Sequence, residues 1–296
     1  MNITKAVIAA AGRGTRFLPV VKQYPKELIA ILDKPQIQYL VEELIGAGIT
    51  DICIVHRHGD PSIKRYFTPD PELENYLEKN QKETYLDSLR SIWSKVNFKF
   101  IPQPRHLPYG NASPVLAAKN FIQNDPFIYL FGDDITIETT PGRYLKKMIA
   151  TFEKYSPAAV LAVKDVGPEE ISRYGSAKYL PNSKIPHQIS GMYEKLPASQ
   201  APSFFGQGGR FIYNGQKLLA TLQTQSTGQG NELWLADANN TLAAADIVLT
   251  EAFDRESDWQ TTGDPLRWLQ VNLTLALKNP QYSAVLKKFL ASLDTV

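Results

Sequence analysis

The chain opens with the segment Lys5-Ala-Val-Ile-Ala-Ala-Ala-Gly-Arg-Gly-Thr-Arg-Phe-Leu-Pro19. Its apolar run, residues 6–10, predicts a buried strand that breaks into a loop at Gly12 and Gly14. Four cations then follow closely: Arg13, Arg16, Lys22 and Lys26. Because glycines let backbone N–H groups approach an anion, this pattern predicts a phosphate-binding loop over residues 11–27. For a lone Gly-x-Gly, an ordinary turn with a solvated basic face is the alternative.

Two commoner phosphate loops do not match this segment. A dinucleotide-binding loop needs a third glycine, and that position holds Phe17, with Pro19 soon after. A P-loop needs Gly-Lys-Ser/Thr, and no glycine of the chain is followed by that pair. The sequence therefore favours an extended basic loop that wraps over a nucleotide, and neither a dehydrogenase nor a P-loop ATPase.

The composition is that of a globular protein. The chain has 296 residues, of which 43% are hydrophobic and 21% charged, so it is long enough for a full core. A net charge of only +2 makes nucleic acid and anionic membranes unlikely partners. The first residues lack a signal-peptide pattern and no apolar run approaches the ~20 residues of a membrane span, so we expect a cytoplasmic protein. The single cysteine, Cys53, is expected to be a buried structural thiol.

The next elements indicate a parallel sheet. Residues 36–47 have apolar positions at helical spacing, with Pro35 before them and Gly48 after them. Residues 51–55 form another apolar strand, which completes a strand–helix–strand unit. Further helices are expected over residues 115–122 and 232–245.

An acidic pair follows a further predicted strand. Residues 127–131 are apolar and end abruptly in Gly132-Asp133-Asp134. Open α/β sheets bind ligands at the carboxyl ends of their strands, and nucleotide-bound Mg²⁺ is commonly held by one or two carboxylates plus phosphate oxygens. We therefore expect a Mg²⁺ site at this acidic pair, whereas an acidic pair elsewhere is usually a solvated turn.

After residue 164 the composition changes to short mixed segments with several glycines and prolines, which favours an antiparallel insertion that carries substrate contacts. We predict an α/β fold: a three-layer, Rossmann-like, mostly parallel sheet with helices on both faces and this insertion embedded in it. One domain, 1–296, would comprise a nucleotide-binding core (1–164), the insertion (165–215), and closing helices with a strand (216–296).

Taken together, the motifs resemble the bacterial UTP–glucose-1-phosphate uridylyltransferases, within the sugar nucleotidyltransferase superfamily. The matching blocks, in order along nearly the whole chain, are Gly12-x-Gly14-Thr15-Arg16-x-Leu18-Pro19, Lys22, Pro25-Lys26-Glu27, Lys34-Pro35-x-Ile37-Gln38-Tyr39, Ala47-Gly48-Ile49, Gln103 with Gly110, Gly132-Asp133-Asp134, Tyr174-Gly175, Glu194-Lys195, Gly230-x-Glu232-Leu233-x-Leu235-x-Asp237 and Gly263-Asp264-Pro265. The first block is highly specific for the superfamily. The later blocks are individually weak, and their order along the chain is what supports the resemblance.

The resemblance implies a Mg²⁺-dependent reaction in which a glucose 1-phosphate oxygen attacks the α-phosphorus of UTP, giving UDP-glucose and pyrophosphate. It assigns catalysis to Arg16, Lys26 and Asp133, with Asp133 as the metal ligand. The nucleotide would contact Ala11, Gly12, Gly14, Thr15, Gln103 and Gly110. The insertion would bind the sugar phosphate through Gly175, Glu194 and Lys195. The family also commonly forms homo-oligomers.

Three positions depart from the family pattern. Thr261 stands where the family has a second metal-binding aspartate, Asn111 where it has histidine, and Leu196 where it has proline. A hydroxyl is a far poorer Mg²⁺ ligand than a carboxylate. Either Asp133 suffices, helped by Asp134, Asp258 or Asp264, or turnover is impaired. Two alternative functions therefore stay open: a regulatory protein that binds nucleotide sugars, and a thymidylyltransferase that makes dTDP-sugars.

Overall fold

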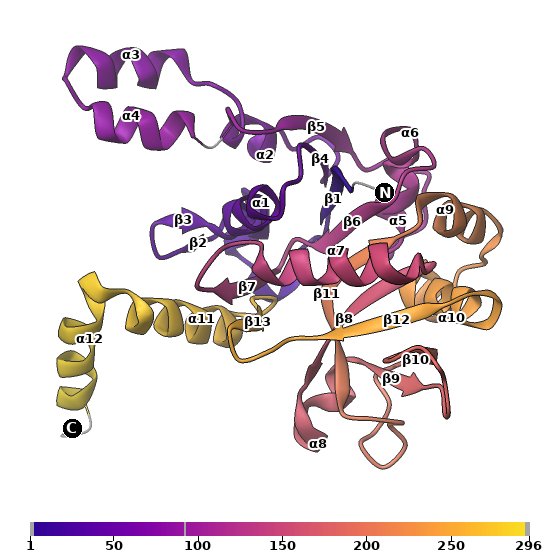
Figure 1. The fold of residues 1–296 in the computed structure, drawn as a ribbon. Coiled ribbons are helices and arrows are strands. Elements are labelled where there is room, and N and C mark those ends of the chain that lie inside the picture. The colour runs from indigo at the N-terminus through magenta and orange to yellow at the C-terminus, as the bar shows by residue number, and fades with distance from the viewer. Residues whose placement is uncertain (1–2, 92, 294–296) are drawn as a thin grey trace.

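The computed structural model describes residues 3–91 and 93–293, and its largest feature is a sheet of nine strands (Figure 1). Seven of them lie side by side in the order β10-β9-β11-β6-β1-β4-β5, and β8 pairs with β11 and with β12. Their bounds are β1 Lys5–Ala10, β4 Asp51–His56, β5 Asn97–Pro102, β6 Phe127–Phe131, β8 Ala159–Asp165, β9 Gly175–Tyr179, β10 Ile189–Glu194, β11 Phe205–Tyr213 and β12 Val248–Ala252.

The centre of the sheet is parallel. Strand β1 pairs in parallel with β4 on one side and with β6 on the other, so that Lys5 lies opposite both Asp51 and Phe127. The apolar runs that predicted these strands are buried on both faces, as helix-covered parallel strands require. Their carboxyl ends therefore meet along one edge, where the loop after β1 approaches the loop after β6.

Helices cover both faces of the sheet, because alternate strand residues point to opposite sides. Ile8 and Ile54 belong to one apolar cluster, whereas Val7 and Cys53 belong to the other. The first cluster includes residues of α1 (Gln36–Ala47), α2 (Ser62–Tyr66), α7 (Arg143–Tyr155) and α11 (Pro265–Lys278). The second includes residues of α5 (Ser113–Ala117), α6 (Lys119–Ile122), α9 (Gly215–Thr224) and α10 (Leu235–Ala245). The predicted α/β fold with three layers is confirmed, and Cys53 is the expected buried thiol.

The antiparallel part reaches further than the sequence indicated. Strands β9 and β10 form an antiparallel pair, as expected of the insertion, but β11 returns to the central sheet and pairs antiparallel with both β6 and β8. Its residues 209–213 are all buried, so the strand is core rather than excursion. A small separate sheet pairs β13 (Ser257–Thr261) with β7 (Asp134–Glu138) and brings Thr261 opposite Asp134.

Three other segments differ from their predictions. The loop over residues 11–27 is coiled rather than extended and includes 3₁₀ turns at Thr15–Phe17, Val20–Lys22 and Lys26–Leu28. The helix expected over residues 115–122 is divided into α5 and α6 at Ala118. The helix expected from Glu232 begins at Leu235, because residues 232–234 are held extended by a neighbouring loop.

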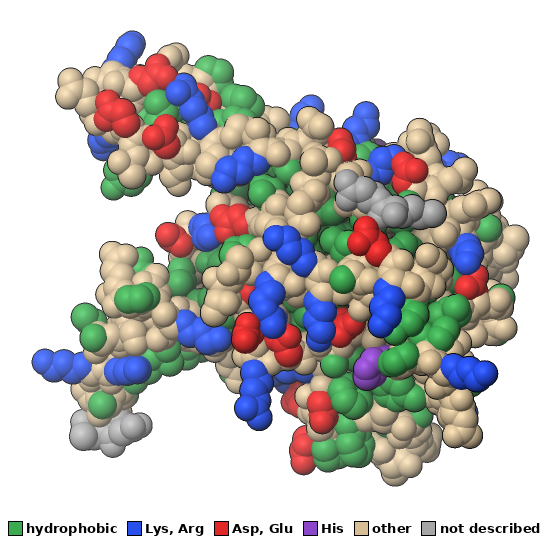
Figure 2. Space-filling model, in the orientation of Figure 1, with side chains coloured by type: hydrophobic (Ala, Val, Ile, Leu, Met, Phe, Trp, Pro, Cys, Tyr) green, Lys and Arg blue, Asp and Glu red, His purple; other side chains and the backbone are tan. Residues whose placement is uncertain are grey.

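Peripheral helices project from the body on one side (Figure 1). Helices α3 (Pro71–Lys79) and α4 (Glu83–Arg90) form a hairpin, and α12 (Pro280–Leu293) follows α11 at the carboxyl end. The remaining elements are α8 (Gly167–Glu170), β2 (Ala30–Ile31) and β3 (Lys34–Pro35). Figure 2 shows acidic and basic side chains interspersed over the face in view. None of the described helices combines the length and apolar character of a bilayer span.

Candidate active site

A first cavity of about 350 Å³ lies where the loop after β1 meets the end of β6. The predicted residues that line it are Ala11, Gly12, Arg16, Lys26, Gln103, Gly110 and Asp133. Gly14 and Thr15 are not among its lining residues. They shape the loop instead: Gly14 has φ 61°, and its carbonyl accepts a hydrogen bond from the backbone N of Phe17 at 2.8 Å. The loop and the strand ends together line the cavity in which the nucleotide is expected.

Lys26 and Asp133 form an ion pair at the floor of this cavity. The Nζ of Lys26 lies 2.5 Å from Oδ2 of Asp133, and the two side chains are only 15% and 28% exposed. Burial alone would lower the pKa of Lys26, but the charge of Asp133 raises it above its usual range. Burial alone would raise the pKa of Asp133, and the charge of Lys26 instead lowers it. Both groups are therefore charged at neutral pH.

Oxygen and nitrogen atoms surround a small space beside Gly263. A methyl group built on Gly263 would lie 3.1 Å from Oδ2 of Asp133, 3.4 Å from Oγ1 of Thr261 and 3.6 Å from a guanidinium nitrogen of Arg16. The missing side chain thus leaves room among a carboxylate, a hydroxyl and a cation. Such a space suits a phosphate oxygen or a hydrated cation.

The donor set fits Mg²⁺ that arrives with a nucleotide. Among the described residues, no group of three or more His, Cys, Asp or Glu side chains could hold a metal ion. Mg²⁺ seldom needs such a cage, because it usually keeps several waters and takes one or two carboxylates plus substrate phosphates. The oxygens of Asp133 and Thr261 meet that lower requirement.

The three acids considered as substitutes for Thr261 differ in their surroundings. Asp258 does not line either cavity at this site and accepts a hydrogen bond from Lys164 at 2.7 Å. Asp264 caps α11 through the backbone N of Arg267 at 3.0 Å. Asp134 is buried beneath Asp133, and burial together with the charge of Asp133 raises its pKa to about 7. None of these three acids lines both cavities, whereas Asp133 lines both and is ionised at neutral pH.

Gly110 lets two distant segments approach each other at the wall of the first cavity. Its φ of 135° is rare for residues with a side chain, and a Cβ there would lie 2.2 Å from the carbonyl oxygen of Leu233. The backbone N of Leu233 donates to the carbonyl of Tyr109 at 2.7 Å, and Ala112 donates back to Leu233 at 3.1 Å. The Gly110 loop and the segment before α10 are thereby joined.

A second cavity of about 510 Å³ adjoins the first. Gly175, Glu194 and Lys195, the predicted sugar-phosphate residues, all line it. Burial raises the pKa of Glu194, although the nearby ammonium of Lys195, 3.7 Å away, opposes this shift. A Cβ on Gly175 would lie 3.0 Å from Oε2 of Glu194, so the glycine keeps space open beside this carboxylate.

The two cavities share five lining residues: Arg16, Asn111, Phe131, Asp133 and Trp234. A ligand in each cavity would therefore meet its neighbour beside Asp133 and Arg16. Asn111 has a structural task at this boundary, because its Oδ1 accepts a hydrogen bond from the backbone N of Leu235 at 2.8 Å and so caps α10. This contact gives a physical reason for the amide at the position where histidine was expected.

Sequence reasoning missed several residues of the two cavities, among them Glu27 and Trp234. Glu27 lines the first cavity, is 1% exposed, and neither carboxylate oxygen has a hydrogen-bond partner among the described residues. Burial raises its pKa to about 7. Trp234 lies between the two cavities. Glu27 was in a quoted motif, but no sequence signal shows that a glutamate is buried; Trp234 lay at an unspecified position of its motif.

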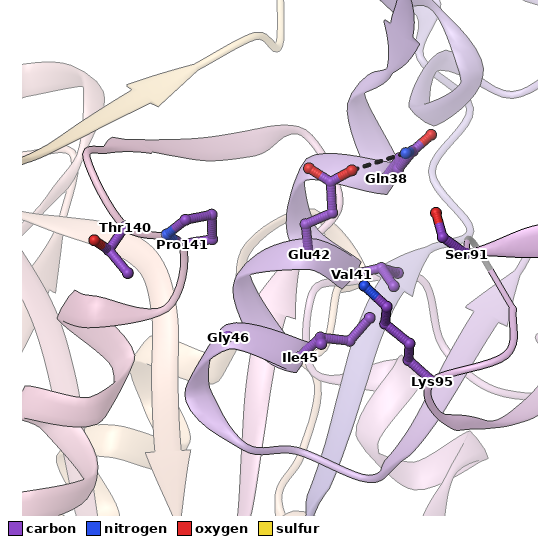
Figure 3. A pocket seen from close by; sticks show the side chains of 9 residues that line it. All are labelled: Gln38, Val41, Glu42, Ile45, Gly46, Ser91, Lys95, Thr140 and Pro141. Carbon is purple, nitrogen blue, oxygen red and sulfur yellow. Dashed lines mark hydrogen bonds between the residues drawn. The ribbon is translucent and has the colours of Figure 1, made fainter. Parts of the chain in front are cut away.

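Another cavity, of about 380 Å³, contains none of these residues. It is lined by Gln38, Val41, Glu42, Ile45 and Gly46 of α1, by Ser91 and Lys95 after α4, and by Thr140 and Pro141 before α7 (Figure 3). Glu42 is already paired there with Lys34 and with Gln38. The predicted residues thus gather at the two adjoining cavities and not at this one.

Comparison with known proteins points to one family. The family described as nucleotidyl transferase matches residues 5–277. The chain is 35% identical over 292 residues to the UTP–glucose-1-phosphate uridylyltransferase of Bacillus subtilis (strain 168), covering 99% of this chain and 97% of that protein. A UDP-glucose pyrophosphorylase from Acinetobacter baumannii superposes with a TM-score of 0.86 at 30% identity, over 99% of this chain and 100% of that chain. A UDP-glucose pyrophosphorylase complexed with UDP-glucose gives 0.82 at 30% identity, over 94% and 100%.

Proposed function

The chain belongs to the nucleotidyl transferase family, and from that premise we propose that it is an enzyme that condenses UTP with glucose 1-phosphate to give UDP-glucose and pyrophosphate. The observation that carries this proposal is the pair of adjoining cavities. One has the glycine-rich, basic loop at its floor, the other has an acid and a lysine suited to a sugar phosphate, and both reach Asp133 and Arg16.

The reaction requires alignment and charge neutralisation rather than a protein nucleophile. A phosphate oxygen of glucose 1-phosphate forms a bond to the α-phosphorus of UTP, and the bond from that phosphorus to the bridging oxygen breaks, which releases pyrophosphate. We assign Arg16 and Lys26 to the triphosphate and the departing pyrophosphate, and Lys195 to the phosphate of the sugar. Glu194 would accept hydrogen bonds from sugar hydroxyls.

We propose that Mg²⁺ is the cofactor. Asp133 would hold it together with phosphate oxygens, and Thr261 is the nearest further oxygen donor. When bound, the cation would neutralise charge that develops on the phosphate oxygens. Lys26 is already paired with Asp133, so its ammonium lies beside the place where the triphosphate would bind. Gly12, Gln103 and Gly110 would contact the base or ribose.

Pyrophosphate release tests this proposal. Purified protein with Mg²⁺ is offered UTP, dTTP, CTP, ATP or GTP with a panel of hexose 1-phosphates. We expect the fastest release with UTP and glucose 1-phosphate. Preference for dTTP would instead indicate a thymidylyltransferase, because uracil and thymine differ by one methyl group, which is worth only about 1 to 3 kcal/mol.

Thr261 motivates the second candidate, a regulatory protein that binds nucleotide sugars with impaired turnover. Calorimetry with UDP-glucose separates the two ideas. Tight binding without pyrophosphate release would favour the regulatory protein, whereas turnover in the ordinary range of about 1 to 10³ per second would end that idea.

We further propose that the chain forms homo-oligomers through α12. This helix buries none of its residues, yet it carries apolar side chains at helical spacing: Tyr282, Val285, Phe289 and Leu293 are 37%, 74%, 56% and 51% exposed. A helix with such a stripe normally packs against another surface. Light scattering should give a mass above that of one chain, and Val285→Asp with Phe289→Asp should reduce it. A monomeric mass for the unaltered protein would rule out this proposal.

We also propose that residues 1–296 act as one nucleotidyltransferase domain, since the two cavities draw on residues from 9 to 264. The boundaries at residues 164 and 215 stay predictions, as do the cytoplasmic location and the absence of nucleic-acid and membrane partners.

A further inference from the structure

Trp234 stands at the boundary of the two cavities and contacts the sugar-phosphate lysine. It lies just before α10, is half-buried, and lines both cavities. The Nζ of Lys195 lies 5.3 Å from the centre of its ring, within the range of a cation–π contact. None of the other four residues shared by the cavities makes such a contact with Lys195 among the interactions of the described chain.

The position of Trp234 is fixed from two sides. Before it, Leu233 is joined to the Gly110 loop by two backbone hydrogen bonds. After it, Asn240 of α10 binds strand β10: its Oδ1 accepts from the backbone N of Met192 at 2.6 Å, and its Nδ2 donates to the carbonyl of Met192 at 3.0 Å. Since β10 leads into Lys195, these bonds hold the backbone of Lys195 near the segment that carries the indole.

Lys195 itself is not held by burial. Its side chain is 54% exposed, and its nearest carboxylate oxygen, on Glu194, lies 3.7 Å away. Its backbone has φ 50°, and its N donates to the carbonyl of Tyr174 at 3.0 Å, so the backbone is fixed while the long side chain is not. A lysine side chain has large rotational freedom, which is lost when it binds a phosphate.

We propose that Trp234 is a positioning residue whose indole face holds the ammonium of Lys195 at the boundary between the two cavities, and thereby raises the affinity for the sugar 1-phosphate. This inference rests on the proposed function of the site. An aromatic face suits the task because it attracts the cation without a carboxylate that would repel the phosphate. The Lys195 side chain would then have lost part of its conformational entropy before the substrate binds, so binding would cost less free energy.

Steady-state kinetics of two substitutions at this position provide the test. Trp234→Leu removes the aromatic face and should raise KM for glucose 1-phosphate about twofold to thirtyfold, the range of about 0.5 to 2 kcal/mol for a cation–π contact. KM for UTP should rise by a clearly smaller factor, although Trp234 also lines the nucleotide cavity. Trp234→Phe keeps an aromatic face and should recover most of the affinity. In a Lys195→Met background, Trp234→Leu should have little further effect.

A matched control, Tyr193, lies on β10, the strand that leads into Lys195. The Nζ of Lys178 is 5.9 Å from the ring of Tyr193, and neither residue lines the two cavities. Tyr193→Leu should therefore leave both KM values unchanged. The inference is overturned if Trp234→Leu raises KM for UTP as much as for the sugar phosphate, if Phe gives no recovery, or if the Trp234 and Lys195 effects are additive.

Failure of the proposed function would be visible separately. If the unaltered protein releases no pyrophosphate with any nucleotide and sugar phosphate, the proposed function fails, and binding of glucose 1-phosphate and of inorganic phosphate is then measured by calorimetry. Weaker binding to Trp234→Leu, with recovery in Trp234→Phe, would still support the positioning role. Equal binding to all three proteins, including no detectable binding, would overturn it.

Discussion

The two halves of the proposed site hold their cations by different means. In the nucleotide half, Lys26 is 15% exposed and is paired with Asp133 at 2.5 Å. In the sugar half, Lys195 is 54% exposed, 3.7 Å from Glu194, and rests over Trp234. Burial and a close countercharge fix the first cation, whereas the second contacts a residue far away in the sequence, just before α10.

The two halves therefore differ in how firmly their residues are held before substrate binds. The nucleotide half is formed at the ends of buried parallel strands, which leave little freedom to the residues that follow them. The sugar half is formed by β9, β10 and the start of α10, which meet only through tertiary contacts. Substitutions in the first half should therefore alter the chemistry or the stability, and substitutions in the second should mainly alter substrate affinity.

The largest effect is expected from Asp133→Asn. Loss of this charge should lower kcat by about 10²- to 10³-fold, the usual cost of removing one electrostatic contribution to the transition state. It should also lower the free energy of unfolding by about 1 to 3 kcal/mol, because Lys26 loses its countercharge. Pyrophosphate release and urea unfolding measure the two effects. Asp258→Asn, an acid outside both cavities, is the control, and a near-normal rate for Asp133→Asn would place the metal elsewhere.

Glu27→Gln should change the pH dependence of stability. Burial raises the pKa of Glu27 from 4.5 to about 7, so the folded state binds its proton more tightly than the unfolded state. The corresponding stability is present below pH 4.5 and is lost as pH rises to about 7. The glutamine variant lacks this loss and should be about 3 kcal/mol more stable at pH 8.

Urea unfolding at several pH values between 4 and 8 measures this difference. Glu194→Gln is the matched substitution in the sugar half. Its pKa is also raised by burial, but the side chain is 33% exposed, so its effect should be smaller. If the two variants gave equal shifts, burial would not be what distinguishes the two halves.

Lys195→Met should raise KM for glucose 1-phosphate about tenfold, which is the lower end of the range for a hydrogen bond to a charged group. KM for UTP should stay nearly constant, because Lys195 does not line the nucleotide cavity. Kinetics with each substrate varied in turn would show the split. Equal changes in both KM values would mean that the two halves do not act separately.

Thr261→Asp should have the smallest effect. A second carboxylate beside Asp133 should lower the Mg²⁺ concentration for half-maximal rate by about fivefold, or about 1 kcal/mol. Thr261 lies opposite the buried Asp134, so this gain would be reduced by repulsion between the carboxylates. Magnesium titrations of the rate measure it, with Thr261→Ser as the control. An unchanged requirement would show that the position does not face the metal.

Much of the fold could be predicted, because the buried residues of helices and strands recur in the sequence at regular spacings. Helix α1 and strand β6 have the predicted bounds, and β1 and β4 differ from prediction by one residue. The start of α10 was misplaced, because backbone bonds from the Gly110 loop override the local preference of residues 232–234. The role of β11 was also missed, since an apolar strand does not specify its partner.

The site, like the fold, has features that the sequence predicted and features that it did not. Most residues predicted for the nucleotide do line the first cavity, whereas Gly14 and Thr15 shape the loop instead. Glu27 could not be recognised as buried and without a hydrogen-bond partner, because its side chain packs close to Gly132, which is distant in the sequence.

Residue order alone is enough to predict the parallel core, the basic loop after β1 and the acid after β6, because strand patterning and short motifs depend on neighbouring residues. Which distant side chains meet depends instead on how the elements pack. Their packing pairs Lys26 with Asp133 and brings Trp234 over Lys195, and it places Thr261 opposite Asp134. The physical reason is that such contacts join segments far apart in the chain, and their geometry is set by how the sheet and helices pack.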